Sequence, residues 1–414
     1  TSYRPANIKN LDIKWETQEQ WNIGLDLGFF NNRVNLVVDY YNKKSSDMLM
    51  QLILPSFMGT SGNGSSALAA PYGNYGDIEN KGLEIALNTR PIETKNFSWG
   101  SDFQISFNKN KLKSLSNSTA LLGYGQWTDV VARSVVGESL YNFYGYEVEG
   151  VYTSFEDLLN SPVNTLQSNN PVTVERDENG NVTKAEWSTD PTKYNSRNTT
   201  FVGDIKYKDV NHDGVIDEKD KTNIGSPLPD FTFGWNNTFH YKQWDLTVFI
   251  NGSVGNKVGN YNKMKLTHMN SAWTNQLTDV NGRVHLAPAD GVYADGWYNN
   301  IANVVATGNG GYPRASINDP NDNDAWSSRF IQDGSYLRLK NISLSYTFDK
   351  KLVGKIGLEN VRATISATNL FTITGYDGYD PEVGASTTSA NVFGLDNGRY
   401  PSPTSWTFGL NVSF

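Results

Sequence analysis

The end of the chain alternates strictly between large apolar side chains and small or polar ones. The apolar residues Trp406, Phe408, Leu410, Val412 and Phe414 take every second position. Because successive side chains of a β-strand point to opposite faces, this pattern predicts a strand with one apolar and one polar face. The same alternation recurs in residues 21–29, 34–40, 97–107, 231–235, 244–250, 342–348 and 361–367. The chain is therefore expected to be all-β.

The connections between these segments distinguish two all-β architectures that share the alternation. In a soluble sandwich the apolar faces meet in a core, whereas in an outer-membrane barrel they face lipid and the polar faces line the lumen. Short connections at 30–33, 91–96, 137–138 and 241–242 take turns with long ones at about 53–74, 115–125, 154–229, 257–326 and 376–401. A membrane barrel has short turns on one rim and long external loops on the other. The sequence therefore predicts an antiparallel transmembrane β-barrel.

The number of strands predicts that the barrel is incomplete in this chain. About eleven strands are expected, at 13–30, 33–52, 75–90, 97–114, 126–136, 140–153, 230–241, 243–256, 327–349, 360–375 and 402–414. The first would begin on the external side, whereas single-chain bacterial barrels have an even number of strands. An open sheet edge in lipid leaves backbone groups unsatisfied, at several kcal/mol each. We therefore expect another chain or segment to close the barrel.

Composition supports this fold class and excludes several classes of function. Aromatic residues make up 13% of the 414 residues, while hydrophobic residues as a whole reach only 38%. The formal net charge of -8 argues against nucleic acid as a partner. The absence of cysteine excludes disulfides and thiolate metal sites, and no apolar run is long enough for a transmembrane helix. The chain begins without an initiator methionine or signal-peptide pattern, so we expect a mature product or a fragment.

Several blocks of sequence carry a resemblance to a known family. They include "WNIGLDLGFFNNRVNLVVDYYNKKSSDML", "NKGLEIAL", "GDIKYKDVNHDGVIDEKDKTNIGSPLPDFTFGWNN", "YLRLKNISLSYTF" and "NLFTITGYDGYDPEV". In this order, and nearly from end to end, the chain resembles the SusC/RagA-like TonB-dependent transporters of the Bacteroidetes outer membrane. The resemblance implies a 22-stranded barrel filled by an N-terminal plug domain. Residues 1–414 would be the C-terminal half of that barrel, without the plug, the TonB box or the first strands.

The same resemblance implies a function and a set of partners. The intact protein would be an importer of nutrients too large for porins, such as oligosaccharides or peptides, and would lie in outer-membrane lipid. A SusD-like surface lipoprotein would close over it as a lid. The TonB–ExbB–ExbD complex would supply energy by pulling on the plug. The sequence leaves the choice between glycan and peptide open.

The segment Asp209–Asp220 matches a calcium-loop pattern. Oxygen ligands are expected from Asp209, Asn211, Asp213, the Val215 carbonyl, Asp217 and Asp220, because Gly214 permits the sharp turn of an EF-hand loop. The flanking sequences do not form amphipathic helices, which argues against a helix-opening calcium sensor. Two interpretations stay open: a cation, most simply Ca²⁺, stiffens the base of an external loop, or the segment is an Asx-rich turn that satisfies its own backbone.

Aromatic residues of the expected external loops are candidates for substrate binding. They are Trp273, Tyr293, Trp297, Tyr298 and Trp326. Aromatic faces offer a large contact area at low entropic cost, although the same residues could pack within their own loop or contact the lid. Catalytic motifs are missing: we find no nucleophile elbow, Walker A loop or dinucleotide fingerprint, so the protein is not expected to be an enzyme. The carboxylates of Asp319, Asp322 and Asp324 are predicted to belong to a solvated loop.

An alternative function belongs to a different class. A secreted or surface-attached all-β glycan-binding protein with a calcium-stabilised loop would show the same alternation and the same Asp-rich segment. The two hypotheses differ in whether the apolar strand faces point to lipid or to a core. A secreted glycosidase is a third possibility, because carboxylates are plentiful in the loops.

Overall fold

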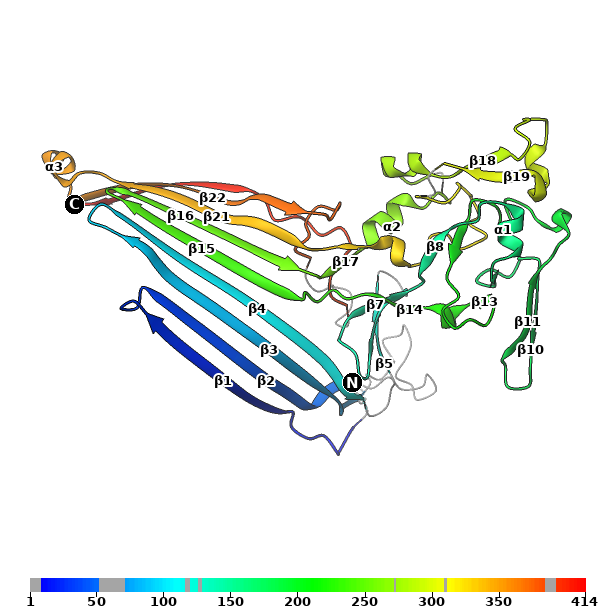
Figure 1. Cartoon of the computed structure of the whole chain (residues 1–414), viewed down its shortest axis with the longest axis horizontal. Coiled ribbons are helices and arrows are strands. Elements are labelled where there is room, and N and C mark those ends of the chain that lie inside the picture. Colours follow the sequence, from blue (N-terminus) through cyan, green and yellow to red (C-terminus); the bar gives the residue numbers. More distant parts are fainter. Residues whose placement is uncertain are drawn as a thin grey trace, which may run out of the picture.

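The computed structural model describes residues 9–51, 71–115, 120–125, 129–271, 273–308, 311–383 and 392–414. Its largest feature is a nine-stranded antiparallel sheet with the order β1-β2-β3-β4-β15-β16-β21-β22-β24 (Figure 1). The strands are β1 (Thr17–Phe29), β2 (Val34–Gln51), β3 (Tyr72–Glu93), β4 (Phe97–Leu115), β15 (Phe231–Tyr241), β16 (Trp244–Val254), β21 (Tyr336–Thr347), β22 (Asn360–Thr374) and β24 (Ser405–Ser413). The predicted all-β class is confirmed.

The register of the sheet collects the apolar side chains on one face. Leu25 lies opposite Val38, Val38 opposite Ile85, and Ile85 opposite Ile105. These large apolar residues do not enter a core: the exposed fraction is 54% for Leu25 and 69% for Leu410 on β24. An apolar face of this extent is the surface that a barrel wall turns toward lipid.

Short turns join the strands at one end of the sheet and long segments join them at the other, as predicted. The β1–β2 turn passes through Phe30, Asn31 and Asn32, and the β15–β16 turn through Lys242, all with positive φ. Strands β21 and β22 are joined at the same end by α3 (Lys350–Val353) and η8 (Gly354–Ile356). By the rule for membrane barrels this end is the periplasmic rim, and the opposite end is the external rim.

Two of the expected strands are not part of the sheet. Residues 126–136 and 140–153 were expected to cross the membrane, but β4 pairs directly with β15. The described parts of the two segments hold only the short strands β6 (Val130–Val135), β7 (Asn142–Gly145) and β8 (Val148–Val151). These are shorter than the roughly 9–11 residues that a membrane-crossing strand needs. Positive φ at Gly137 and Tyr141 breaks the extended run. The expectation of eleven strands is therefore corrected to nine in the described chain.

The remaining elements form an external module beyond the external rim, made of described residues within 120–230, 255–335 and 392–396 (Figure 1). Besides β6–β8 its strands are β5 (Ala120–Tyr124), β9 (Val163–Asn164), β10 (Val172–Arg176), β11 (Val182–Trp187), β12 (Ile205–Tyr207), β13 (Val215–Ile216), β14 (Thr222–Gly225), β17 (Lys257–Asn260), β18 (His285–Pro288), β19 (Val304–Thr307), β20 (Ile331–Asp333) and β23 (Leu395–Asp396). Its helices are α1 (Phe155–Leu159), η2 (Pro191–Lys193), η3 (Glu218–Asp220), α2 (Tyr261–Thr267), η4 (Thr278–Gly282), η5 (Trp297–Asn299), η6 (Ile301–Asn303) and η7 (Ser328–Phe330). Across the described ranges, no helix combines the length and the apolar character needed to span a bilayer.

Shared hydrophobic cores join the two long segments of the external module, which lie within residues 120–230, between β4 and β15, and within residues 255–335, between β16 and β21. One cluster packs Phe201 of the first segment against Ile301 of the second, and both side chains are fully buried. Another packs Val131 against Trp326, whose indole N–H donates to the Val131 carbonyl at 3.0 Å. Each such large apolar side chain contributes roughly 1.5–3 kcal/mol when buried. The segments therefore fold together rather than as separate loops.

Local sequence signals account for two small elements of the first segment. Ser154 accepts a hydrogen bond from the Asp157 amide and so caps the start of α1. Strands β10 and β11 form a hairpin, with Gly180 at a φ of 82° in its turn. A glycine suits this position because L-residues with a Cβ rarely adopt positive φ. The hairpin projects away from the rest of the external module (Figure 1).

Candidate functional site

The Asp-rich segment predicted to bind calcium folds as a tight loop between β12 and β14. The Asp209 carboxylate accepts hydrogen bonds from the amides of Asp213, at 3.3 Å, and Gly214, at 2.8 Å. The Asn211 side chain accepts from the Asp213 amide at 2.9 Å, and the Asp213 carboxylate accepts from the Val215 amide at 3.0 Å. These are successive Asx turns, and positive φ at His212 and Gly214 lets the chain reverse between them.

The second half of the loop is fixed by a fully buried carboxylate. Asp220 accepts hydrogen bonds from the Val210 amide at 2.9 Å and the Asp217 amide at 2.8 Å, so it connects the two ends of the loop. Burial raises the pKa of Asp220, and its hydrogen bonds with backbone amides act in the opposite direction. Asp217 caps η3 by accepting from the Lys219 amide, and its carboxylate lies 3.3 Å from the Arg176 guanidinium. The loop is thereby attached to the β10–β11 hairpin.

The donor atoms of this loop are of the kind that Ca²⁺ takes. Carboxylates, an amide oxygen at Asn211 and the Val215 carbonyl are all hard oxygen ligands. The flanks are extended in β12 and β14, and no helix pair of the sensor type frames the loop within the described chain. The same oxygens already satisfy the loop's own amides, which accounts for its fold as an Asx-rich turn. Calcium binding by Asp209–Asp220 stays a prediction.

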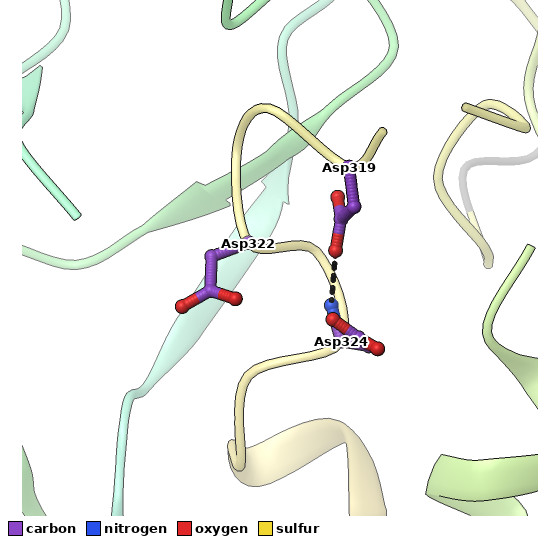
Figure 2. Close-up of side chains that lie close together, drawn as sticks. All are labelled: Asp319, Asp322 and Asp324. Carbon is purple, nitrogen blue, oxygen red and sulfur yellow. Dashed lines mark hydrogen bonds between the residues drawn. The ribbon is translucent and has the colours of Figure 1, made fainter. Parts of the chain in front are cut away.

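A second acidic group lies in the external module at Asp319, Asp322 and Asp324 (Figure 2). One carboxylate oxygen from each lies within 4.8 Å of the others, and no other trio of histidine or carboxylate side chains in the described ranges meets this distance. The Asp319 carboxylate accepts from the amides of Asn323 at 2.9 Å and Asp324 at 3.3 Å. This is the same pattern of acceptance from the fourth and fifth following residues that Asp209 shows in the first loop.

The environment of this group differs from the solvated loop that was expected. Burial is the largest cause that raises the pKa of Asp319 well above its usual range, and the hydrogen bond and charge of Asp324 act in the same direction. Burial also raises the pKa of Asp322 to about 6. The three side chains are half-buried, so the loop is less solvated than expected. The spacing Asp319-x-Asn321-x-Asn323 repeats that of Asp209-x-Asn211-x-Asp213, and it is the sequence signal that could have identified a structured loop.

A buried polar network beside this group ties the two external segments together. Asp204 is fully buried and pairs with Arg314 through Nε at 2.8 Å and Nη2 at 2.9 Å. The Asn323 side chain donates to Asp204 at 3.0 Å. Asn321 donates to the Ile205 carbonyl at 2.9 Å and accepts from Asn164 at 2.9 Å. Buried polar groups of this kind specify one arrangement, since any other arrangement leaves them without partners.

The predicted aromatic residues fall into two different environments. Trp273, Tyr293 and Tyr298 have exposed fractions of 95%, 70% and 51%. Trp297 lies between the two tyrosines, with ring centroids 5.6 Å from Tyr293 and 5.9 Å from Tyr298 in edge-to-face geometry. We call Tyr293, Trp297 and Tyr298 the aromatic cluster. Trp326 is only 5% exposed and belongs to the core, so its ring is not available to a ligand at the surface.

Comparison with known proteins gives these features a family. No protein-family model matches the chain. Over 99% of its length the chain is 32% identical to TonB-dependent receptor P3 of Formosa agariphila, and over 98% it is 27% identical to TonB-dependent receptor SusC of Bacteroides thetaiotaomicron. Along nearly its whole length the chain is therefore similar to TonB-dependent receptors, SusC among them. It spans about a third of the length of these relatives, 35% of P3 and 32% of SusC.

Solved structures agree with the fold of this SusC/RagA-like receptor. The RagAB peptide importer in its closed-closed state superposes on 98% of the chain with a TM-score of 0.63 at 20% identity, and the chain covers 36% of that structure. The open-open state of the same importer gives a TM-score of 0.62. Receptors of this family are outer-membrane β-barrels. The receptor therefore lies in the outer membrane, and the apolar face of its nine-stranded sheet faces lipid.

Proposed function

We propose that this receptor imports a nutrient across the outer membrane by TonB-dependent active transport. Similarity to TonB-dependent receptors along the whole chain carries the proposal. The lipid-facing sheet and the folded external module support it, because a transporter needs a membrane wall and a surface that meets the substrate. In this proposal a plug domain and further strands complete the barrel at the edges β1 and β24, where backbone groups need partners in lipid. A SusD-like lipoprotein covers the external side, TonB–ExbB–ExbD supplies the energy, and no catalytic activity is assigned.

Uptake by intact cells tests this proposal. Cells that contain the receptor, cells without it, and cells without TonB would be given fluorescent oligosaccharides and fluorescent peptides. We expect one substrate class to accumulate only when both the receptor and TonB are present, and a SusD-like lipoprotein to copurify in detergent. Equal uptake of both classes in all three strains would contradict the proposal. Recovery of the protein as a soluble monomer without detergent would support the glycan-binding alternative instead.

We further propose that exposed aromatic rings of the external module make the first contact with the nutrient. Trp273, Tyr293 and Tyr298 offer exposed aromatic surfaces on which sugar rings or apolar peptide side chains can stack, whereas Trp297 is half-buried and packs against the core. Alanine substitution of Trp273 and Tyr293 is expected to raise the substrate concentration needed for half-maximal uptake without reducing the amount of receptor in the membrane. Phe155→Ala in the core beside Tyr194 is a control for general damage to the module. Unchanged uptake by both surface variants would instead assign these rings to packing or to the lid.

The Asp-rich loop is proposed to hold a Ca²⁺ ion that stiffens the base of the first external segment. The donor set Asp209, Asn211, Asp213, the Val215 carbonyl, Asp217 and Asp220 supports this assignment. Elemental analysis of receptor purified without chelator is expected to find calcium, and Asp213→Ala to lose it while the barrel still assembles. Lack of calcium in the unmodified receptor would leave the Asx turns as the full account of the loop.

A further inference from the structure

The lipid-facing side of β1–β4 changes character toward the external rim. One row across these strands is apolar: Ile23 lies opposite Tyr40, Tyr40 opposite Leu83, and Leu83 opposite Phe107. Side chains two positions further along a strand return to the same face, so the next rows toward the external rim can be read from the register. They mark the upper limit of the apolar face in this part of the sheet.

Lysines take four of the eight positions in these next two rows, and glutamates take two. In the first, Trp21 lies opposite Asn42, Asn42 opposite Lys81, and Lys81 opposite Lys109. In the second, Glu19 lies opposite Lys44, Lys44 opposite Glu79, and Glu79 opposite Lys111. Lys113 follows at an irregularity of β4 and reaches the same place, with its ammonium 3.4 Å from the Glu79 carboxylate. We call Lys44, Lys81, Lys109, Lys111 and Lys113 the basic rows.

The acidic residues nearby neutralise the basic rows only in part: Glu19 lies opposite Lys44, and Glu79 lies in the same row between Lys44 and Lys111. Glu79 is shared between Lys81, at 3.0 Å, and Lys113, at 3.4 Å. Asp77, one row further out, accepts from the Ser114 hydroxyl and the Asp47 amide. Lys44, Lys109 and Lys111 are exposed, and none of them forms an ion pair with any residue that the structure describes. The basic rows therefore carry excess positive charge on a face that continues into the lipid-facing wall.

The surface is also shaped for an amphipathic molecule. A shallow groove on this side of the sheet is lined by the apolar side chains of Tyr40, Leu83 and Phe107. The cationic side chains of Lys81, Lys109 and Lys111 line the same groove on its external side, together with the Glu79 carboxylate. The apolar part of the lining is therefore followed by a part that carries three ammonium groups and one carboxylate. Such a groove fits a ligand with hydrocarbon chains at one end and a negatively charged group at the other.

The basic rows lie where the wall extends furthest toward the external side. On β16, β21 and β22 the lipid-facing positions closest to the external rim are the apolar residues Val254, Leu337 and Ile373. By the register of the sheet these positions lie below the level of the basic rows. The lysines of β2–β4 are therefore carried on the longer strands of the wall.

We propose that the basic rows bind the phosphate groups of an outer-leaflet glycolipid, with its acyl chains against Tyr40, Leu83 and Phe107. Lysine ammonium groups pair with phosphate as point charges, and basic pockets at membrane depth hold anionic lipid headgroups. A glycolipid is the occupant because the groove faces lipid at the external rim, where the outer leaflet begins. The lipid shields five neighbouring ammonium groups from one another and anchors this side of the barrel. The site is separate from the route of the imported nutrient, so it does not depend on the proposed transport.

Native mass spectrometry of receptor purified from outer membranes tests the site directly. The lipid probes are a bis-phosphorylated lipid A, the same lipid A after enzymatic removal of its phosphates, and phosphatidylglycerol. The variant is Lys81→Gln with Lys109→Gln and Lys111→Gln. The matched control removes as much charge from the periplasmic rim, by Lys350→Gln with Lys351→Gln and Lys355→Gln. A heat-modifiable band on electrophoresis verifies that each variant has folded.

We expect the unmodified receptor and the periplasmic control to retain phosphorylated lipid A equally. At about 1 kcal/mol for each lysine near a charged membrane surface, the triple variant should bind it roughly 100-fold more weakly. Equal binding of dephosphorylated lipid A would overturn the role of the phosphates. Equal binding of phosphatidylglycerol would overturn the choice of a glycolipid. Full retention by the folded triple variant would remove the basic rows from the site.

Discussion

Replacing Arg314 by methionine would test how firmly the two external segments are joined. The change removes the guanidinium but keeps most of the aliphatic volume, and it leaves the Asp204 carboxylate fully buried with the Phe201 amide and the Asn323 side chain as its remaining donors. Removal of one partner from a buried pair costs roughly 3–5 kcal/mol, because the other charge stays in a low-dielectric site. We expect the substitution to lower the free energy of opening the junction by about 3 kcal/mol, the lower end of this range, because two hydrogen bonds to Asp204 persist.

Hydrogen exchange followed by mass spectrometry measures this loss of stability at individual backbone segments of the junction. The Ile205 amide donates to the Asn323 side chain at 2.7 Å and the Arg314 amide donates to the Gly203 carbonyl at 2.8 Å, so both report on the junction. A loss of about 3 kcal/mol makes their exchange roughly 100-fold faster if it proceeds through local opening. Exchange in the strands of the sheet should not change.

Two further variants show whether the reasoning is right. Lys184→Met breaks the exposed pair between Lys184 and Glu186 in the same module, and exposed pairs contribute at most about 1 kcal/mol, so exchange should hardly change. Adding Asp204→Asn to Arg314→Met removes the unpaired charge and should restore part of the protection. Unchanged exchange in Arg314→Met, or no recovery in the double variant, would refute the assignment of this pair as the junction.

Three other predictions follow from the same structure. Burial raises the folded-state pKa of Asp322 to about 6 and that of Asp319 still further, so both carboxyl groups hold protons that the unfolded chain has lost. The free energy of unfolding of the module should therefore decrease as pH rises from about 4 through 6 and beyond. Asp322→Asn should make the thermal unfolding temperature depend less on pH. Trp326→Ala should destabilise the module by about 3–5 kcal/mol, while Trp273→Ala, at a site 95% exposed, should change its stability by less than about 0.5 kcal/mol in the same measurement. On β21, Ile342→Arg on the lipid face should cost roughly 2–4 kcal/mol in folding into bilayers, whereas Ser343→Arg on the opposite face should be tolerated; equal costs would mean that the two faces are wrongly assigned.

The sheet could be predicted from the sequence because its determinants are local. Alternation with period two defines a strand and its faces, so the predicted strand 360–375 corresponds to β22 at Asn360–Thr374. The strands expected at 126–136 and 140–153 were inferred from the short connection at 137–138, and this signal was misleading because short turns also join the short strands inside the external module. Pairing of β4 with β15 is a long-range choice that the period of either strand does not encode.

The environment of the candidate sites was less accessible to prediction. The partial burial of Asp319 and the nearly complete burial of Trp326 arise from packing between two external segments that are far apart in the sequence. Composition marks both segments as loops, and loops are ordinarily solvated. The internal hydrogen bonds of the Asp209 loop, in contrast, depend on residues within a few positions of one another, and the Asx-turn interpretation followed from their spacing alone.

The shared cores of the external module also bear on how the sheet can assemble. Neighbours β4 and β15 are separated in the chain by residues 116–230, so their pairing closes a long loop. The entropic cost of closure rises slowly with loop length, by about 0.6 kcal/mol for each doubling, and a compact insert reduces the effective length further. The Leu112 amide of β4 donates to the Glu138 carbonyl at 2.9 Å, and the Lys257 amide, which follows β16, donates to the Ser226 carbonyl at 2.8 Å, so the insert is attached to β4 and to the segment that follows β16, the partner of β15. An insert that folds early would hold β4 and β15 in position to pair, and the module would act as a template for the order of strands in the wall.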